Sequence, residues 1–304
     1  YEISECLVGS EMCIRDRNTD VVMVDTGNSY EGLCEYLGGK YISYTEEKPI
    51  TMNPFRINRE EMNVEKTGFL KNLVLLIWKG TQGTITKTED RLIEHVITEY
   101  YDAYFNGFEG FTPQQREDLR KSLVIDDRNR GEQKGESEQE RAARIEDTIN
   151  KIESRRMKLK VKELSFNSFY EYSVQRIPDI CDENRITGID ISTYRYMMKD
   201  FYRGGNHDKT LNENMDSSLF DETFIVFEID SIKDDPLLFP LVTLIIMDVF
   251  LQKMRIKKSR KVLVIEEAWK AIASPLMAEY IKFMYKTAPV SYTHLRAHET
   301  LANL

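Results

Sequence analysis

Three short, largely apolar runs constrain the fold of this chain more than any other feature of its sequence. They are Val21–Val24, Phe224–Ile229 and Val262–Ile265, and most of their residues are β-branched or aromatic. Such runs are typical of strands that are covered on both faces, as in a parallel sheet. The segments Pro236–Arg255 and Ala268–Tyr285 have helical patterns, so the order of elements predicts an α/β fold.

The long segment between the first and second of these runs has a different pattern. A short, more polar run, Tyr41–Tyr44, fits a strand at an edge of the sheet. Beyond it, apolar residues recur at helical spacing over Val64–Trp78 and Glu89–Phe105. We therefore predict a large all-α insertion between strands of the sheet.

Helix-start signals agree with this insertion. A capping residue is followed three positions later by Gln or Glu in three segments, namely Thr112–Gln115, Ser137–Glu140 and Ser168–Glu171. A further helix is expected to run from about Asp190 and to close at Gly204 and Gly205, because glycine commonly ends helices.

The strongest local motif is Lys261–Trp269, which reads KVLVIEEAW. Four apolar residues that end in two carboxylates have the Walker B arrangement, in which a buried strand delivers acids to the carboxyl edge of a parallel sheet. There Glu266 would hold Mg²⁺ through its water shell, and Glu267 would orient or deprotonate an attacking water. The alternative is a strand that simply ends in solvated acids. The Ala-Trp pair that follows and the sheet context favour the functional interpretation.

A second motif surrounds Asp25. The run VVMVDTGNSY ends a predicted strand at this residue and continues in a turn that could approach a nucleotide or a neighbouring subunit. An ordinary strand-to-helix turn is the alternative, and the residues alone do not decide between them. An aspartic protease would require a second Asp-Thr/Ser-Gly to share the proton, and this chain contains none.

The sequence contains no phosphate-binding loop of the form G-x-x-x-x-G-K-[S/T]. Gly39 and Lys40 resemble its end, but Tyr41 replaces the required hydroxyl residue and Cys34 the first glycine. In an ATPase of this kind, that loop precedes the strand that ends at Asp25. We therefore expect the loop to have been lost by truncation.

Both ends of the sequence can be traced to one DNA segment. Residues Cys6–Arg17 read CLVGSEMCIRDR and residues Val290–Thr300 read VSYTHLRAHET. The reverse complement of codons for the first peptide, read in another frame, encodes the second. We interpret both as a translated library adapter, which should be excluded from fold reasoning. We expect residues 1–17 and 290–304 to have no stable packing against the rest.

Composition bears on nucleic-acid binding, on the redox compartment and on membrane insertion. The net charge of −9 gives no support for broad nucleic-acid binding. Outside the adapter-like ends only Cys34 and Cys181 remain, which indicates a reducing compartment and no disulfide framework. The longest apolar run, Leu237–Leu251, is too short to span a bilayer, so a buried helix is the better interpretation.

Several motifs together resemble one protein family. The segments are VVMVDTGNSYEGLC, ITMNPF, FYRGG, FIVFEIDSIKDDPLLFPLVTLIIM and VLVIEEAWKAIASPLMAEYIKFMYKT. Through them the chain resembles the TraG-type ATPases of conjugative transposons, which belong to the large ATPase class of type IV secretion systems. The resemblance extends over nearly all of residues 18–289.

The resemblance implies a RecA-like core of the HerA/FtsK group, assembly as a homo-hexamer, and use of ATP and Mg²⁺. It also implies a cytoplasmic location at the inner face of the inner membrane, in a complex with other type IV secretion subunits. By resemblance, Glu266 is the magnesium-associated acid, Glu267 the catalytic glutamate, and Asp25 a cofactor-binding residue on the strand after the nucleotide loop. The family's sensor glutamine and arginine finger match nothing in this chain. Direct DNA binding is left open.

The resulting expectation is an α/β fold with an incomplete RecA-like parallel sheet and a large all-α insertion. Its parts are 18–60 as the first part of the ATPase core, 61–222 as the mainly helical insertion, and 223–289 as the core with Walker B. The parent protein is expected to hydrolyse ATP for conjugative transfer, whereas this fragment, without its Walker A loop, is expected to be inactive. Alternatives are a DNA-pumping translocase or coupling protein of the same fold group, or a non-catalytic scaffold subunit.

Overall fold

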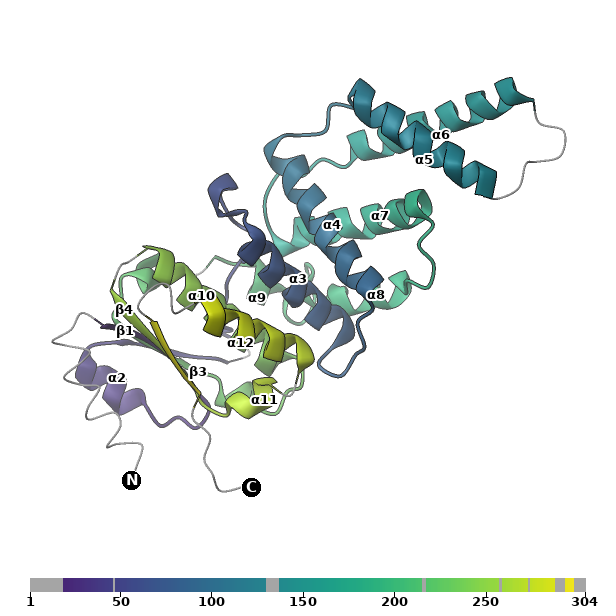
Figure 1. Cartoon of the computed structure of the whole chain (residues 1–304). Helices are drawn as coiled ribbons and strands as arrows, with labels where there is room; N and C mark the ends of the chain where they lie inside the picture. Colours follow the sequence, from purple (N-terminus) through teal and green to yellow (C-terminus); the bar gives the residue numbers. More distant parts are fainter. Residues whose placement is uncertain are drawn as a thin grey trace.

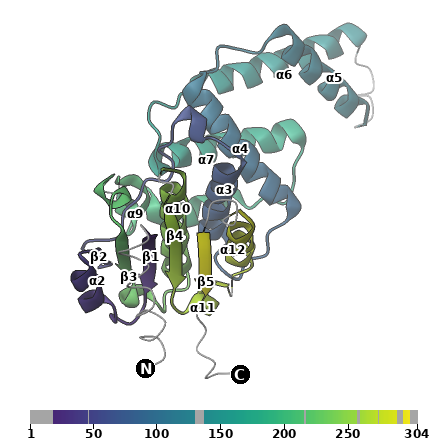
Figure 2. The ribbon, with the colours of Figure 1, turned by 60° about the vertical axis from the view of Figure 1, so that its left-hand side comes forward.

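The computed structural model describes residues 19–45, 47–129, 137–214, 217–256, 259–272, 274–287 and 293–297. Its strands are β1 (Thr19–Asp25), β2 (Lys40–Ser43), β3 (Phe224–Glu228), β4 (Arg260–Ile265) and β5 (Thr293–Ala297). They pair in parallel in the order β2-β3-β1-β4-β5. The prediction that the three apolar runs lie parallel in one sheet is confirmed, and β2 lies at an edge as expected. Figure 2 shows the strands side by side.

The central strand β1 is buried along its whole length because both faces of the sheet are covered. Val21 and Met23 pack with Cys34 of helix α2 (Glu31–Leu37) on one face. Val22 and Val24 face the larger core, which includes helix α10 (Leu238–Ile256). Since successive strand residues point to opposite faces, a strand between two helical layers is apolar on both faces over its middle, as Val21–Val24 are.

We expected no stable packing of residues 290–304, and this expectation is wrong for residues 293–297. These residues form β5, which pairs in parallel with β4, so that Lys261 lies opposite Thr293 and Ile265 opposite Ala297. A physical reason is available in the backbone. An uncovered strand edge presents a row of N–H and C=O groups that pairs with any extended segment within reach, with little demand on its side chains. The expectation for residues 1–17 lies outside the described residues.

The helices between β2 and β3 make up the predicted insertion. They are α3 (Val64–Lys79), α4 (Lys87–Phe105), α5 (Pro113–Asn129), α6 (Glu138–Lys158), α7 (Phe166–Asn184), α8 (Ile191–Met198) and α9 (Asp208–Asn212). Short 3-10 turns are η1 (Arg59–Glu61), η2 (Lys199–Phe201), η3 (Ser217–Phe220) and η4 (Asp230–Ile232). After β4 come α11 (Ala268–Ile272) and α12 (Pro275–Thr287).

The molecule is elongated, with the sheet at one end and the α5–α6 hairpin at the other (Figure 1). The hairpin is held largely by ion pairs across the two helices. Arg116 reaches Glu146 at 2.7 Å, and Arg120 reaches the same carboxylate at 2.7 Å. Between hairpin and sheet lie α3, α4, α7 and α8, whose apolar residues join the main core. Among the described residues, no helix combines the length and apolar character needed to cross a membrane.

Two of the three predicted capping boxes are confirmed and one is wrong by one turn. Reciprocal hydrogen bonds join Thr112 with Gln115, and Ser137 with Glu140. The third helix, α7, is capped by Ser165, whose hydroxyl accepts the N–H of Ser168. The earlier start places Phe166 in the helix, where its side chain is fully buried. Burial of this ring in the core favours the earlier helix start.

Two other predicted helices differ from the expectation, since one ends early and one is divided. The helix predicted from Asp190 ends at Met198, and the 3-10 turn η2 follows it. Gly204, with φ of 78°, belongs to the turn beyond. The predicted helix over Ala268–Tyr285 divides into α11 and α12, and Pro275 occupies the first position of α12. Proline lacks an N–H donor, so it begins a helix more readily than it continues one.

The helical part is joined to the sheet by buried polar contacts as well as by apolar packing. Lys66 on α3 donates to Asp248 on α10 at 2.6 Å, and each side chain is only 3% exposed. On α4, the Glu99 carboxylate pairs with the Arg176 guanidinium of α7 at 2.6 Å. The first ion pair thus holds α3 against α10 and the second holds α4 against α7, because a buried charge is tolerated only with its partner in place.

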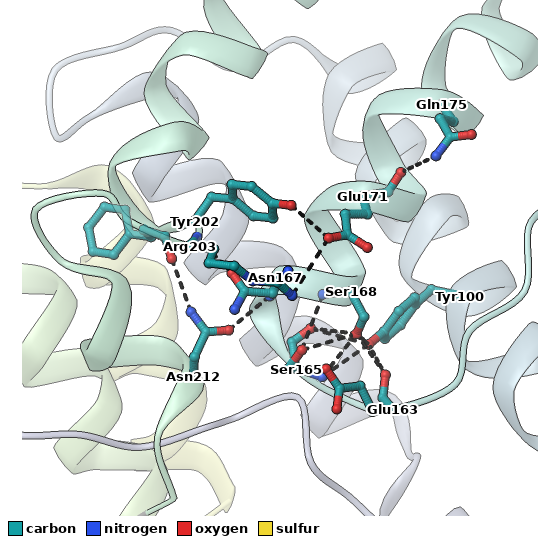
Figure 3. A network of polar contacts seen from close by, with 11 residues as sticks. Tyr100, Glu163, Ser165, Asn167, Ser168, Glu171, Gln175, Tyr202, Arg203 and Asn212 are labelled. Atoms are coloured by element: carbon teal, nitrogen blue, oxygen red, sulfur yellow. Dashed lines mark hydrogen bonds and ion pairs between the residues drawn. The ribbon is translucent and has the colours of Figure 1, made fainter.

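A hydrogen-bond network joins α4 to the start of α7 (Figure 3). The Tyr100 hydroxyl shares a hydrogen bond with the Ser168 hydroxyl at 2.6 Å and donates to the Ser165 carbonyl at 3.2 Å. The side chain of Asn212 accepts the Asn167 N–H and so connects α9 to α7. The network therefore holds the N-terminal turn of α7 from two sides.

Candidate active site

The carboxyl ends of three neighbouring strands bring acidic residues together. Asp25 ends β1, and it lies opposite Glu228 at the end of β3. On the other side, Val24 lies opposite Ile265 of β4, so Glu266 follows directly beside Asp25. The N–H of Glu266 continues this pairing with a bond to the Val24 carbonyl at 3.1 Å. Asp25 and Glu266 therefore share one edge of the sheet, as expected where parallel strands end.

Asp25 organises the turn that follows it. Its side chain is fully buried, and its two carboxylate oxygens accept three backbone N–H groups, from Gly27 at 3.1 Å, Ser29 at 2.9 Å and Tyr30 at 3.1 Å. Asp suits this position because its short carboxylate reaches the N–H groups of the residues that follow it. The turn is therefore held closed over the end of β1, and helix α2 begins directly after it.

Glu228 is a member of this cluster that the sequence analysis missed. Its carboxylate accepts the N–H of Asn28 at 2.9 Å, the hydroxyl of Tyr41 at 3.2 Å and the N–H of Asp230 at 2.7 Å. Burial, together with the nearby Asp25 carboxylate, raises the pKa of Glu228 to about 6. A signal was present in the sequence, because this residue is the only charged one in its apolar run and lies at the same strand end as Asp25.

Glu266 is linked to the same turn from the β4 side. Its carboxylate accepts the Thr26 N–H at 3.3 Å and is hydrogen-bonded to the Tyr30 side chain. Burial raises the pKa of Glu266, and the neighbouring Asp25 carboxylate adds to the effect. Burial and the Glu266 carboxylate likewise raise the pKa of the Tyr30 hydroxyl, which therefore remains a proton donor.

Glu267 lies one residue beyond and has different partners. Its backbone has φ of 49°, in the left-handed region that non-glycine residues seldom adopt. Its carboxylate accepts the indole N–H of Trp269 at 2.6 Å, and no hydrogen bond joins it to the other acids among the described residues. The two adjacent acids of the motif are thus held in separate environments, as expected for side chains with separate roles.

Comparison with known proteins identifies the family. The profile of the TraG P-loop domain matches residues 11–113 and 104–294, which together span most of the chain.

The chain belongs to the TraG P-loop domain family.

Its fold is similar to that of VirB4 of Thermoanaerobacter pseudethanolicus, with a TM-score of 0.54 and 16% sequence identity. The match covers 96% of this chain and 66% of the VirB4 chain, so this TraG P-loop domain chain spans less than two thirds of its structural relative. No curated protein matches the sequence. The likeness confirms the predicted P-loop-type α/β core with helical insertions.

In this TraG P-loop domain, the acids fit the Mg²⁺ part of a nucleotide site, but the turn after β1 does not fit the phosphate-binding part. Carboxylate oxygens are suitable partners for the water shell of Mg²⁺. Within the described residues, no three His, Cys, Asp or Glu side chains are arranged to bind a metal ion directly. The N–H groups of the Thr26–Tyr30 turn all donate to the carboxylates of Asp25, Glu228 and Glu266. The turn therefore does not fit a phosphate cradle, which needs free N–H groups.

Proposed function

We propose that this chain carries the acidic half of the ATP-hydrolysing site of a conjugation or type IV secretion motor. The observation that carries the proposal is the meeting of Asp25 and Glu266 at one carboxyl edge, with Glu267 directly beyond it. In open α/β sheets, this edge is where ligands bind. Membership of the TraG P-loop domain family supports an ATP-driven role over other uses of such an edge.

Each acid has a proposed role that follows from its surroundings. Glu266 is fixed by the Thr26 N–H and Tyr30 and would hold the water shell of Mg²⁺. Glu267 lies outside the cluster and would orient or deprotonate the attacking water. Asp25 would act on the cofactor side of the same edge by keeping the turn after β1 closed. Bound Mg²⁺ would supply charge neutralisation for the phosphates.

The phosphate-binding loop is proposed to come from residues of a longer protein that this sequence does not contain. Two observations support this: the sequence has no Walker A motif, and every backbone N–H group of the Thr26–Tyr30 turn already donates to a carboxylate. This chain alone is then expected to show no micromolar binding of Mg·ATP by calorimetry. A single site of micromolar affinity would overturn this part of the proposal.

The setting of the motor is proposed from the resemblance to TraG-type ATPases. It comprises a homo-hexamer at the cytoplasmic face of the inner membrane, in contact with other type IV secretion subunits. The elongated shape, with a helical hairpin far from the sheet, provides a surface for such contacts at a distance from the acids.

The decisive experiment measures ATP hydrolysis by the longer protein that contains this sequence. We expect hydrolysis in the unmodified protein and a loss of roughly 10²–10⁴-fold in Glu267→Gln, the usual contribution of a positioned general base. Glu279→Gln, on α12, is the matched control and should keep the parental rate. A parent that hydrolyses no ATP would favour the scaffold alternative, and stimulation by DNA would favour the translocase alternative.

A further inference from the structure

Trp269 makes its one side-chain hydrogen bond to the proposed catalytic acid. Its indole N–H donates to Oε2 of Glu267 at 2.6 Å, although the ring itself is 56% exposed. An indole has a single donor and no acceptor, so this contact uses its whole hydrogen-bonding capacity. Among the described residues, the Glu267 carboxylate is the hydrogen-bond partner of this indole.

The backbone around the pair is fixed at both ends. The Glu267 carbonyl accepts the Lys270 N–H at 2.8 Å, so helix α11 begins directly after the acid. The Lys270 ammonium reaches Asp234 at 3.0 Å, in the segment that follows β3, and lies 5.7 Å from the centre of the Trp269 ring. The left-handed backbone of Glu267 lies between the end of β4 and the start of α11. Acid and indole are thus held at a defined separation.

The hydrogen bond divides the two carboxylate oxygens of Glu267 into different roles. Oε2 receives the indole proton, whereas Oε1 has no hydrogen-bond partner among the described residues. A carboxylate whose one oxygen is fixed cannot rotate freely, so the direction of the other oxygen is set. A general base needs such a direction, because proton transfer requires hydrogen-bond geometry with the water.

We propose that Trp269 is a positioning residue for Glu267: its indole N–H fixes Oε2 and leaves Oε1 to accept the proton of the attacking water. The inference rests on the proposed function of Glu267 and adds a residue that orients it. Trp269 is not proposed to contact the nucleotide or the attacking water.

The hydrogen bond can be tested on this chain without nucleotide. The sequence contains two tryptophans, and Trp78 is buried, so an ¹H–¹⁵N spectrum should show two indole signals. Trp269→Phe identifies the relevant signal by removing it. Glu267→Ala should shift that signal and leave the Trp78 signal in place, whereas the control Glu279→Ala should move neither. A Trp269 indole signal that does not shift in Glu267→Ala would overturn the proposal.

The role in catalysis is tested in the longer ATPase. Trp269→Phe keeps an aromatic ring without the N–H and should lower kcat at least about tenfold with KM unchanged, since bonds to charged groups are strong. Trp269→His restores a ring N–H and should recover part of the rate, which loss of packing alone would not allow. A change confined to KM would overturn the proposal by assigning the ring to substrate binding.

The two proposals fail in different ways. If Glu267→Gln abolishes turnover but Trp269→Phe has the parental kcat, the positioning role is wrong and the proposed function stands. If Glu267→Gln also has the parental rate, the proposed function is wrong and the positioning role is lost with it.

Discussion

The ion pair between Glu99 and Arg176 gives the most quantitative prediction about stability. Both side chains are buried, at 8% and 3% exposed, and the carboxylate also pairs with Arg156 at 2.9 Å. Burial alone would raise the pKa of Glu99, but hydrogen bonds from His95 and Arg176, with the positive charges of Arg176 and Arg156, outweigh it. The pKa of this carboxyl is lowered from 4.5 to about 2.

The lowered pKa fixes the sign and the pH window of the effect. The native state binds a proton less readily than the unfolded state, so the stabilisation is fully present above pH 4.5 and is lost as the pH falls towards 2. A difference of this size corresponds to about 3 kcal/mol at neutral pH, of which about 2 kcal/mol is lost by pH 3. Glu99→Gln removes the titrating group and leaves Arg176 with Glu183 as its remaining carboxylate.

The assay is urea unfolding of this chain at pH 7 and at pH 3. Glu99→Gln should lower the free energy of unfolding by about 3 kcal/mol at pH 7 and by about 1 kcal/mol at pH 3. The control is Glu94→Gln on the same helix, where an exposed pair with Lys71 should contribute less than about 1 kcal/mol. Equal destabilisation by Glu99→Gln at both pH values would refute the electrostatic reasoning.

Two further predictions concern other buried charges. Lys66→Met leaves Asp248 buried without its cation and should lower the free energy of unfolding by about 3–5 kcal/mol. The double variant Lys66→Met with Asp248→Leu should recover most of this stability. Unfolding curves in which the double variant is less stable than Lys66→Met would contradict the prediction. Because burial and Asp25 raise the pKa of Glu228 from 4.5 to about 6, the chain should lose about 1 kcal/mol of stability as the pH rises through this range, solvent screening included. Thermal melts of Glu228→Gln should lack this slope, and an unchanged slope would assign it to another group.

The sequence was sufficient to predict the parallel sheet and the proximity of Asp25 and Glu266 at one of its edges. Both follow from local pattern, because a strand that is buried on both faces contains a continuous apolar run and neighbouring parallel strands end at the same edge of the sheet. The position of β2 at an edge followed in the same way from its more polar residues.

Other features depend on contacts that no local pattern contains. The start of α7 was decided by burial of Phe166 in a core built from distant segments. Glu228 joined the acidic cluster through partners from β2 and from the turn after β1. The bond between Trp269 and Glu267 depends on a left-handed backbone that sequence spacing does not predict. Pairing of residues 293–297 required only an open strand edge.

Glu266 and Glu267 are proposed to have separate roles at one edge of the sheet. The most direct test is ATP turnover by the longer protein as a function of Mg²⁺ concentration, in Glu266→Gln and Glu267→Gln variants. Glu266→Gln should need more Mg²⁺ for half-maximal turnover, because an oxygen that holds the water shell is weakened. Glu267→Gln should keep the parental Mg²⁺ dependence and lose roughly 10²–10⁴-fold in maximal rate. A fully active Glu267→Gln beside an inactive Glu266→Gln would contradict the account and reverse the two roles.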